Sequence, residues 1–220
     1  MRKIIVSTFL TMDGVMQAPG GTEEDRTNGF KWGGWIAPYF DEMMNNTLGK
    51  IMSKPFDLLL GRRTYEIFAA HWPYQDGQIG ELFNRVNKYV VATTAIDTSW
   101  KHSILINKDV VNELKKLKQQ DGPDLLVHGS GKLVQTLFAN QLVDVLHSWI
   151  FPITLGEGKK LFEEGTQAQK WKLTESMVST TGAIFTSYVP DGDVETRSVV
   201  PENPSEAELA RRKKWEKEEV

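Results

Sequence analysis

The chain has 220 residues, 40% of them hydrophobic and 25% charged, which is an ordinary balance for a soluble protein and predicts one compact domain with a tail. The formal net charge of −3 gives no general electrostatic attraction for nucleic acid. The absence of cysteine excludes disulfides, thiolate zinc sites and a cysteine nucleophile, and it fits a reducing compartment.

The chain begins with a predicted strand. Residues 3–10 are β-branched and apolar, which is typical of a buried strand, and Met12-Asp13-Gly14 ends the run. The run is too short for the apolar core of a secretion signal, and no stretch approaches the roughly 20 apolar residues of a membrane span. We therefore expect a cytoplasmic protein with no membrane partner and no nucleic-acid partner.

A long loop and a helix follow this strand. Residues 16–38 are rich in glycine, proline and polar residues, and a loop of this length inside a compact domain is usually functional or disordered. Apolar residues then recur at helical spacing over residues 36–52, which predicts a helix that Pro55 ends.

The rest of the pattern alternates strands with helices. We expect strands at residues 56–60, 89–93, 104–106, 124–127 and 143–153, and helices at residues 64–70, 111–117 and 132–139. Residues 171–178 and 183–189 are expected to pair as a final hairpin about Thr180–Gly182. This order predicts an α/β fold with a mostly parallel sheet and antiparallel strands at its C-terminal edge.

The character of the chain changes after Pro190. The residues that follow are polar, and Ser205 is a candidate N-cap for a helix whose large apolar positions are Leu209, Trp215 and Val220. We therefore divide the chain into a domain at residues 1–190 and a charged tail at residues 191–220. The tail is either a solvated segment or an arm that docks on a neighbouring subunit.

The most informative segment follows the strand at residues 56–60. Two arginines and Thr64 come directly after Gly61, at a predicted helix start. Helix N–H groups, a hydroxyl and the fixed charges of Arg62 and Arg63 converge there, and a bound anion would compensate positive charge placed at a helix N-terminus. A phosphate of a nucleotide cofactor is the natural occupant. The alternative is that the arginines are exposed and pair with Glu66 or nearby acids.

A second glycine cluster, Gly129-Ser130-Gly131-Lys132, stands between a predicted strand and a predicted helix. It does not match the P-loop, because Leu126 and Leu133 stand where that motif needs a glycine and a hydroxyl residue. It does not match the dinucleotide fingerprint, because Val134 stands at the third glycine position. Two interpretations remain for this cluster. It is either a Gly-x-Gly turn whose N–H groups can approach an anion, or a tight turn with a purely structural role.

Two more segments end at the same edge of the predicted sheet. Thr93 and Thr94 end one strand, and Asp13 follows another. In open α/β sheets, ligands bind outside the carboxyl ends of the strands. The four segments together predict one phosphate-binding site, although strand propensity and turn formation explain Thr93, Thr94 or Asp13 taken singly.

Together these motifs resemble the dihydrofolate reductase superfamily, and within it the reductase domain of the riboflavin-pathway deaminase–reductase and its free-standing relatives. Residues 61–66 are similar to the Gly-Arg-x-Thr-aromatic-Glu segment, residues 127–132 to the Gly-rich cofactor loop, and residues 7–14 to the Ser-Leu-Asp-Gly first strand. Residues 142–159 are similar to the Val-Asp-Glu-Leu…Pro-x-x-Leu-Gly-x-Gly signature. The resemblance covers residues 1–190 and implies a three-layer α/β/α sandwich.

The resemblance also implies NADPH as the cofactor, a homodimer, and no metal. The implied cofactor-binding residues are Gly61, Arg62, Arg63, Thr64, Thr93, Thr94, Gly129, Ser130, Gly131 and Lys132. Arg62 and Thr93 would lie near the 2′-phosphate. Bidentate pairing of arginine with phosphate is the physical reason to expect NADPH rather than NADH.

The implied activity is hydride transfer to a heteroaromatic or ribosylamino substrate, similar to 5-amino-6-(5-phosphoribosylamino)uracil reductase. The candidate catalytic residues are Asp13, Asp41 and Glu42, and the candidate substrate contacts are Trp32, Trp35, Trp72 and His128. His128 stands where the riboflavin-type reductase has an acidic residue that reads the substrate. The alternatives are a non-catalytic module that binds a nucleotide or pterin, and a dihydrofolate reductase-type activity.

Overall fold

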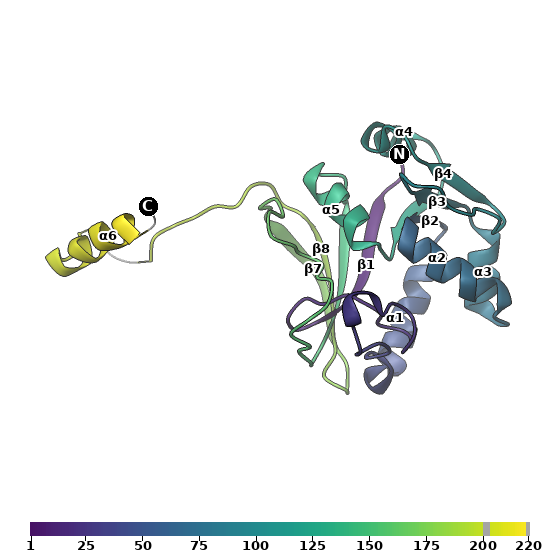
Figure 1. Ribbon diagram of the computed structural model, residues 1–220, viewed down its shortest axis with the longest axis horizontal. Coiled ribbons are helices and arrows are strands. Elements are labelled where there is room, and N and C mark those ends of the chain that lie inside the picture. Colours follow the sequence, from purple (N-terminus) through teal and green to yellow (C-terminus); the bar gives the residue numbers. More distant parts are fainter. Residues whose placement is uncertain (200–202, 219–220) are drawn as a thin grey trace.

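Eight strands form one mixed sheet in the computed structural model, which describes residues 1–199 and 203–218 (Figure 1). The strands are β1 (Ile4–Thr11), β2 (Phe56–Gly61), β3 (Lys88–Val91), β4 (Ser103–Ile106), β5 (Asp124–Val127), β6 (Val145–Phe151), β7 (Trp171–Val178) and β8 (Ile184–Pro190). Their order across the sheet is β4-β3-β2-β5-β1-β6-β8-β7. The pairs from β4 to β6 are parallel, whereas β8 is antiparallel to both β6 and β7, which confirms the predicted sheet.

Helices cover both faces of this sheet. They are α1 (Glu42–Met52), α2 (Arg62–His71), α3 (Gln78–Arg85), α4 (Val110–Gln119) and α5 (Gly131–Ala139). Apolar residues of α4 and α5 pack with Ile4 and Val6 of β1 on one face. Met44 of α1, Tyr65 of α2 and Phe83 of α3 belong to the clusters on the other face. The arrangement confirms the predicted three-layer sandwich, with the core divided by the sheet.

The helix predicted over residues 36–52 begins only at Glu42. The Asp41 side chain accepts a hydrogen bond from the Met44 N–H and so caps α1, and Ala37–Tyr39 forms a separate 3-10 turn. Apolar residues of the turn and of α1 pack into the same cluster, and their spacing is continuous across the boundary. The periodicity therefore marks the buried side of both elements but not the point where the helix starts.

The structure also differs from the prediction at α3 and at the end of β3. Helix α3 was not expected, because its eight residues offer too short a pattern; Phe83 packs it onto the sheet. Strand β3 ends at Val91, so Thr93 and Thr94 lie in the exposed loop beyond it rather than in the strand.

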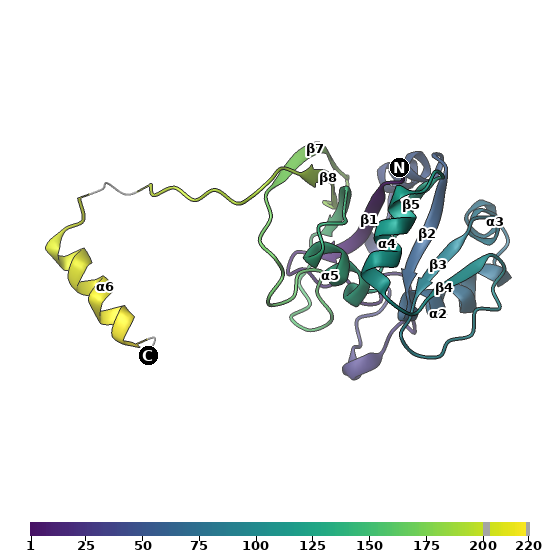
Figure 2. The same cartoon turned by 90° about the horizontal axis from the view of Figure 1, so that it is seen from above.

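The tail contains the helix α6 (Glu206–Glu218), which lies apart from the sheet (Figures 1 and 2). The Ser205 hydroxyl accepts from the Glu208 N–H at 3.3 Å, as the capping prediction requires. Leu209 and Trp215 are exposed, and Val220 lies outside the described residues. Solvation of the tail, its docking on a second subunit and the homodimer all stay predictions. Among residues 1–199 and 203–218, no helix combines the length and apolarity needed to cross a membrane.

A buried ion pair joins the start of β1 to β2. The Arg2 guanidinium lies 2.5 Å from the Asp57 carboxylate, and the two side chains are 2% and 5% exposed. Arg2 also donates to the Pro123 carbonyl and the Tyr89 hydroxyl, while Asp57 accepts from the Asn87 N–H. The buried pair therefore makes several hydrogen bonds and ties Arg2 to three other segments.

We expect Asp57→Asn to lower the free energy of unfolding by about 3–5 kcal/mol, because it leaves the Arg2 charge buried without its counter-ion. Urea unfolding followed by circular dichroism measures the loss. Glu113→Gln is the matched control, because it breaks the exposed pair between Glu113 and Lys116 and should cost at most about 1 kcal/mol. Similar losses in the two variants would contradict the prediction.

Candidate active site

Two glycine turns touch at the carboxyl edge of the neighbouring strands β2 and β5. The N–H of Gly61 donates to the carbonyl of Gly129 across 3.0 Å. A Cβ atom on Gly61 would lie 2.2 Å from the Ser130 hydroxyl oxygen, and one on Gly129 would lie 2.7 Å from the Thr64 hydroxyl oxygen. The contact therefore requires glycine at both positions, and it brings the first turns of α2 and α5 together.

Both of these helices begin without a side-chain cap. Gly61 is the N-cap residue of α2 and Ser130 that of α5, and in these two fully described helices no side chain caps the N-terminus and no acidic residue stands in the first turn. The unpaired N–H groups at a helix N-terminus carry positive partial charge. Two such ends meeting at one point make a position suited to an anion.

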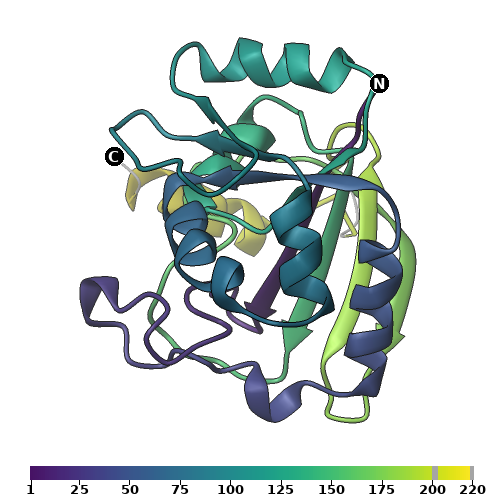
Figure 3. The same cartoon turned by 90° about the vertical axis from the view of Figure 1, so that its right-hand side faces the viewer.

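A cavity of about 980 Å³ opens beside this position. Its walls come from β1, the loop after β1, helices α1 to α3, and the turn that leads into α5. Figure 3 shows the loop, in dark purple-blue, gathered where the β1 arrow ends. Arg63, Thr64, Ser130 and Gly131 line the cavity, so the paired helix N-termini open into it.

Asp25 holds the loop after β1 over the cavity. Its carboxylate forms an ion pair with Lys159, accepts from the Thr27 N–H, and lies 3.9 Å from the Arg63 guanidinium. Burial raises the pKa of Asp25, but the bonds from Lys159 and Thr27 outweigh it and keep the pKa below its usual value. Asp25 is therefore an anion that joins the loop to α2 and to the segment after β6.

Glu24, the neighbour of Asp25, closes the loop on itself. Its carboxylate accepts from the N–H groups of Gly20 and Gly21 at 2.7 and 3.1 Å. Burial is the main cause that raises the pKa of Glu24 above its usual value. Glu24 also lines the cavity, so this loop supplies carboxylates as well as backbone to the cavity wall.

His128 presents a bare nitrogen in the interior. Its Nδ1 lies 3.2 Å from the Ser7 carbonyl, which only accepts, so Nδ1 carries the proton and Nε2 is an acceptor. Among the described residues nothing bonds to Nε2, which is buried. Burial lowers the pKa of His128 to about 4, although the hydrogen bond to Ser7 acts in the opposite direction. The ring is therefore neutral at physiological pH. The ring packs near Phe68 and Phe83, and it lines the cavity.

The structure brings some of the predicted phosphate contacts together and leaves others apart. Gly61, Thr64 and the Gly129–Gly131 turn meet as described above. Arg62 pairs with Glu66 at 2.9 Å, and Lys132 is an exposed residue in the first turn of α5. Thr93 and Thr94 are exposed and do not line the cavity.

Of the three predicted tryptophans, Trp72 lines the cavity. Trp35 is 7% exposed, donates its indole N–H to the Gln17 carbonyl, and belongs to the core. Trp32 is exposed and donates to Glu157. Trp72 is therefore the predicted aromatic contact that faces the cavity.

Asp13 binds backbone rather than facing the cavity. It accepts from the Thr11 hydroxyl and from the N–H groups of Leu155 and Gly156, the last at 2.8 Å. Burial raises the pKa of Asp13, but these hydrogen bonds lower the pKa by more than burial raises it. The carboxylate is therefore ionised at neutral pH. Asp13 ties the end of β1 to the loop after β6 and does not line the cavity.

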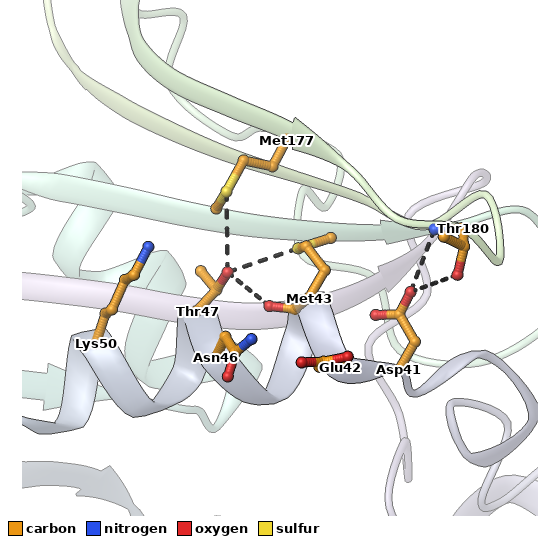
Figure 4. A pocket seen from close by; sticks show the side chains of 8 residues that line it. All are labelled: Asp41, Glu42, Met43, Asn46, Thr47, Lys50, Met177 and Thr180. Carbon is orange, nitrogen blue, oxygen red and sulfur yellow. Dashed lines mark hydrogen bonds between the residues drawn. The ribbon is translucent and has the colours of Figure 1, made fainter.

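Asp41 and Glu42 line a separate groove between α1 and the β7–β8 hairpin (Figure 4). Asp41 caps α1 through the Met44 N–H and accepts from the Thr180 N–H and hydroxyl. These bonds, that from Met44 first, hold the pKa of Asp41 below its usual value. Neither residue lines the large cavity. None of the three predicted proton donors, Asp13, Asp41 and Glu42, therefore has a role in the proposed function.

Sequence reasoning missed much of the cavity wall. The missed polar residues include Glu24, Asp25, His71 and Lys159. His71 and its neighbours on α2 follow the Gly-Arg-Arg-Thr segment by one to two helical turns, and that spacing was a usable signal. Glu24, Asp25 and Lys159 meet only because the loop folds back, and no local pattern marks them. Within the described residues, no group of three or more His, Asp or Glu side chains is placed to hold a metal ion.

Comparison with known proteins adds a family and a fold. Residues 2–185 match the family model of the RibD C-terminal domain. The chain is 25% identical over 192 residues to the protein YyaP of Bacillus subtilis, and the match covers 85% of this chain and 94% of YyaP.

Two solved structures share the fold. A pyrimidine reductase-like protein from Corynebacterium diphtheriae matches with a TM-score of 0.62 and 11% identity, over 87% of this chain and 93% of that chain. Dihydrofolate reductase from Enterococcus faecalis, complexed with NADP(H), matches with a TM-score of 0.55 and 15% identity, over 86% of this chain and 96% of that chain. These matches confirm the predicted dihydrofolate reductase-like fold.

We expect Gly61→Ala to lower the free energy of unfolding by about 1–3 kcal/mol, because the new methyl group collides with Ser130 where the two turns touch. Gly49→Ala is the control: nothing lies within 4 Å of a Cβ at Gly49 in α1, and alanine should stabilise that helix by about 0.5–1 kcal/mol. Chemical denaturation of both variants measures the effects. An unchanged Gly61→Ala protein would show that the turns do not require close contact.

We expect the protein to lose stability as the pH falls from 6.5 to 4. The unfolded chain protonates His128 at its ordinary pKa of 6.5, whereas the folded chain does so only near 4. The unfolded state therefore binds more protons in this window, which lowers the free energy of unfolding by about 3 kcal/mol at its acid end. The partly buried His147 on β6, whose pKa is also lowered to about 4 by burial, acts in the same direction.

Urea unfolding at several pH values between these limits tests this prediction. His128→Phe and His147→Phe should each flatten the pH dependence, since each removes one titrating ring. If His128→Phe keeps the wild-type slope, the folded protein protonates His128 freely and the ring is not neutral in the cavity wall.

Proposed function

The chain belongs to the RibD C-terminal domain family, and from this membership we propose that it is an NADPH-dependent reductase. The matched family is a reductase family, and the model covers nearly the whole domain. The proposed reaction is hydride transfer from the nicotinamide to an unsaturated, heteroaromatic substrate. The cofactor supplies the hydride, and the protein supplies binding, orientation and exclusion of water.

The contact between the two glycine turns carries this proposal. It directs two uncapped helix N-termini at one position in the cavity wall, where the Thr64 hydroxyl and the Ser130 turn also lie. The pyrophosphate of a dinucleotide is a fitting occupant, because it carries two negative charges that the N–H groups would bind. Arg62, Arg63 and Lys132 stand in the first turns of the same helices and would hold the remaining phosphate charge.

The size of the cavity supports the same proposal. Its volume of about 980 Å³ leaves room beyond the phosphate position for a nicotinamide ring and a substrate. The dihydrofolate reductase that shares this fold was solved with NADP(H), which is consistent with such a cofactor here. In the cavity, β1 provides one wall, and Trp72 and His128 stand among the residues available to a substrate.

We expect the protein to bind NADPH more tightly than NADH, and Arg62→Met to weaken NADPH binding by about tenfold through the loss of a charge-assisted bond to phosphate. NADH binding should change little, because NADH lacks the 2′-phosphate. Isothermal titration calorimetry measures both affinities, and Lys116→Met, which removes an exposed lysine of α4, is the control. The proposal fails if NADPH shows no saturable binding at micromolar concentration; equal losses for NADPH and NADH would remove Arg62 from the 2′-phosphate site.

A further inference from the structure

The cavity wall contains two positive side chains that share one carboxylate. Within the described chain, the lysines and arginines that line the cavity are Arg63 of α2 and Lys159 of the segment after β6. Both form ion pairs with Asp25 of the loop after β1. The Asp25 side chain is only 12% exposed, so solvent screens its charge poorly and its two partners decide how that charge acts.

Neither oxygen of Asp25 is hydrogen-bonded to Arg63. Oδ1 accepts from the N–H and the hydroxyl of Thr27 at 3.1 and 2.5 Å, and Oδ2 accepts from Lys159. Lys159 also donates to the Thr27 hydroxyl at 2.7 Å, which closes this group of three residues. The Arg63 guanidinium stands 3.9 Å from Oδ1, too far for a hydrogen bond. Lys159 is therefore the residue that neutralises Asp25.

Gln17 positions both partners of this ion pair. Its side chain, 3% exposed, accepts from the Lys159 N–H at 3.1 Å. Its amide nitrogen donates to the backbone carbonyls of Asp25 and Thr27 at 3.0 and 3.1 Å. One buried amide thus fixes the backbone on each side of the pair, so Lys159 is held where it meets Asp25.

Arg63 keeps its hydrogen-bond donors free. Among the described residues it has no hydrogen-bond partner, and its side chain is 47% exposed. Its neighbour Arg62, in contrast, donates to both oxygens of Glu66 and does not line the cavity. A guanidinium carries five donors in a fork that matches a phosphate group. Arg63 lines the cavity together with Thr64 and Ser130, so it is available to an anion at the helix N-termini.

We infer that Lys159 is a positioning residue for the cofactor pyrophosphate: it neutralises Asp25 and so leaves Arg63 to bind a phosphate oxygen. The inference rests on the proposed function, because it takes the anion at the helix N-termini to belong to a dinucleotide. Without the Lys159 charge, Asp25 would be a poorly solvated carboxylate beside Arg63, and it would pair with that guanidinium instead. The same carboxylate would repel the phosphate.

The affinities for NADPH, NADH and inorganic pyrophosphate, measured by calorimetry near neutral pH, test the inference. We expect Lys159→Met to weaken the binding of all three by about tenfold, because Arg63 loses a charge-assisted hydrogen bond to the ligand. NADH should be affected as much as NADPH, because both contain the pyrophosphate, whereas Arg62→Met is expected to act on NADPH alone. Lys160→Met is the matched control, because Lys160 is exposed and does not line the cavity.

Asp25→Asn separates neutralisation of Asp25 from a direct role of Lys159. Asparagine keeps an oxygen that accepts hydrogen bonds but carries no charge. The double variant Asp25→Asn/Lys159→Met should therefore recover affinities within about threefold of the wild type, and Asp25→Asn alone should bind at least as tightly as the wild type. Lys159→Arg keeps the charge and should stay near the wild type. Lys159→Gln, which also lacks the charge, replaces the methionine variant if that protein does not fold.

Unchanged binding by Lys159→Met would overturn the inference. So would a double variant as weak as Lys159→Met, because Lys159 would then contact the ligand or hold the loop by itself. In both cases, NADPH binding by the wild type leaves the proposed function standing. If the wild type binds pyrophosphate with the expected dependence on Lys159 and Asp25 but binds neither dinucleotide, the proposed function fails and the role of Lys159 is kept for a smaller anion. Binding of none of the three ligands overturns both.

Discussion

The close approach of β2 and β5 at their carboxyl ends determines most of what is distinctive in this protein. Gly61 and Gly129 leave no side chain between the two turns, so helices α2 and α5 start within contact of each other. Two neighbouring parallel strands of an α/β sheet end at one edge, and their helices leave for opposite faces where the strand order reverses, as it does between β2 and β5. Here α2 covers one face and α5 the other, and they share only their N-termini. The cavity begins at that shared point.

The cavity has two chemically different ends. One end offers N–H groups, hydroxyls and the Arg63 guanidinium, which suit phosphates. The other end is lined by aromatic and aliphatic side chains, and the neutral ring of His128 lies among them. The loop after β1 also lines the cavity, and its Asp25 carboxylate is balanced by Lys159 and Arg63. Family membership and fold place the chain among reductases, whereas the residues of the cavity wall are particular to this chain.

The sequence predicted the sheet, and it placed the two glycine turns at one edge of that sheet, because both depend on local patterns. Apolar runs, glycines at strand ends and the Gly61–Glu66 segment are continuous in the chain, and each marks its own place. The apolar part of the cavity wall was predicted less well because its residues come from segments far apart in the chain. Asp41 illustrates the difficulty: a carboxylate near a helix start reads equally well as a cap or as a proton donor, and only the Met44 and Thr180 contacts distinguish them. Trp35 similarly needed its Gln17 bond and burial to be placed in the core.

The position of β1 has a consequence for how the chain is made. Strand β1 lies between β5 and β6, so it is synthesised before both of its partners, and its backbone pairs only once residues 124–127 and 145–151 have been made. The Arg2 charge likewise waits for Asp57 and for the Pro123 carbonyl. Long-range pairing of this kind makes folding slow and leaves a hydrophobic strand unprotected during synthesis. The centre of the sheet therefore forms only after β6 has been synthesised, and the apolar side chains of β1 stay unpaired until then.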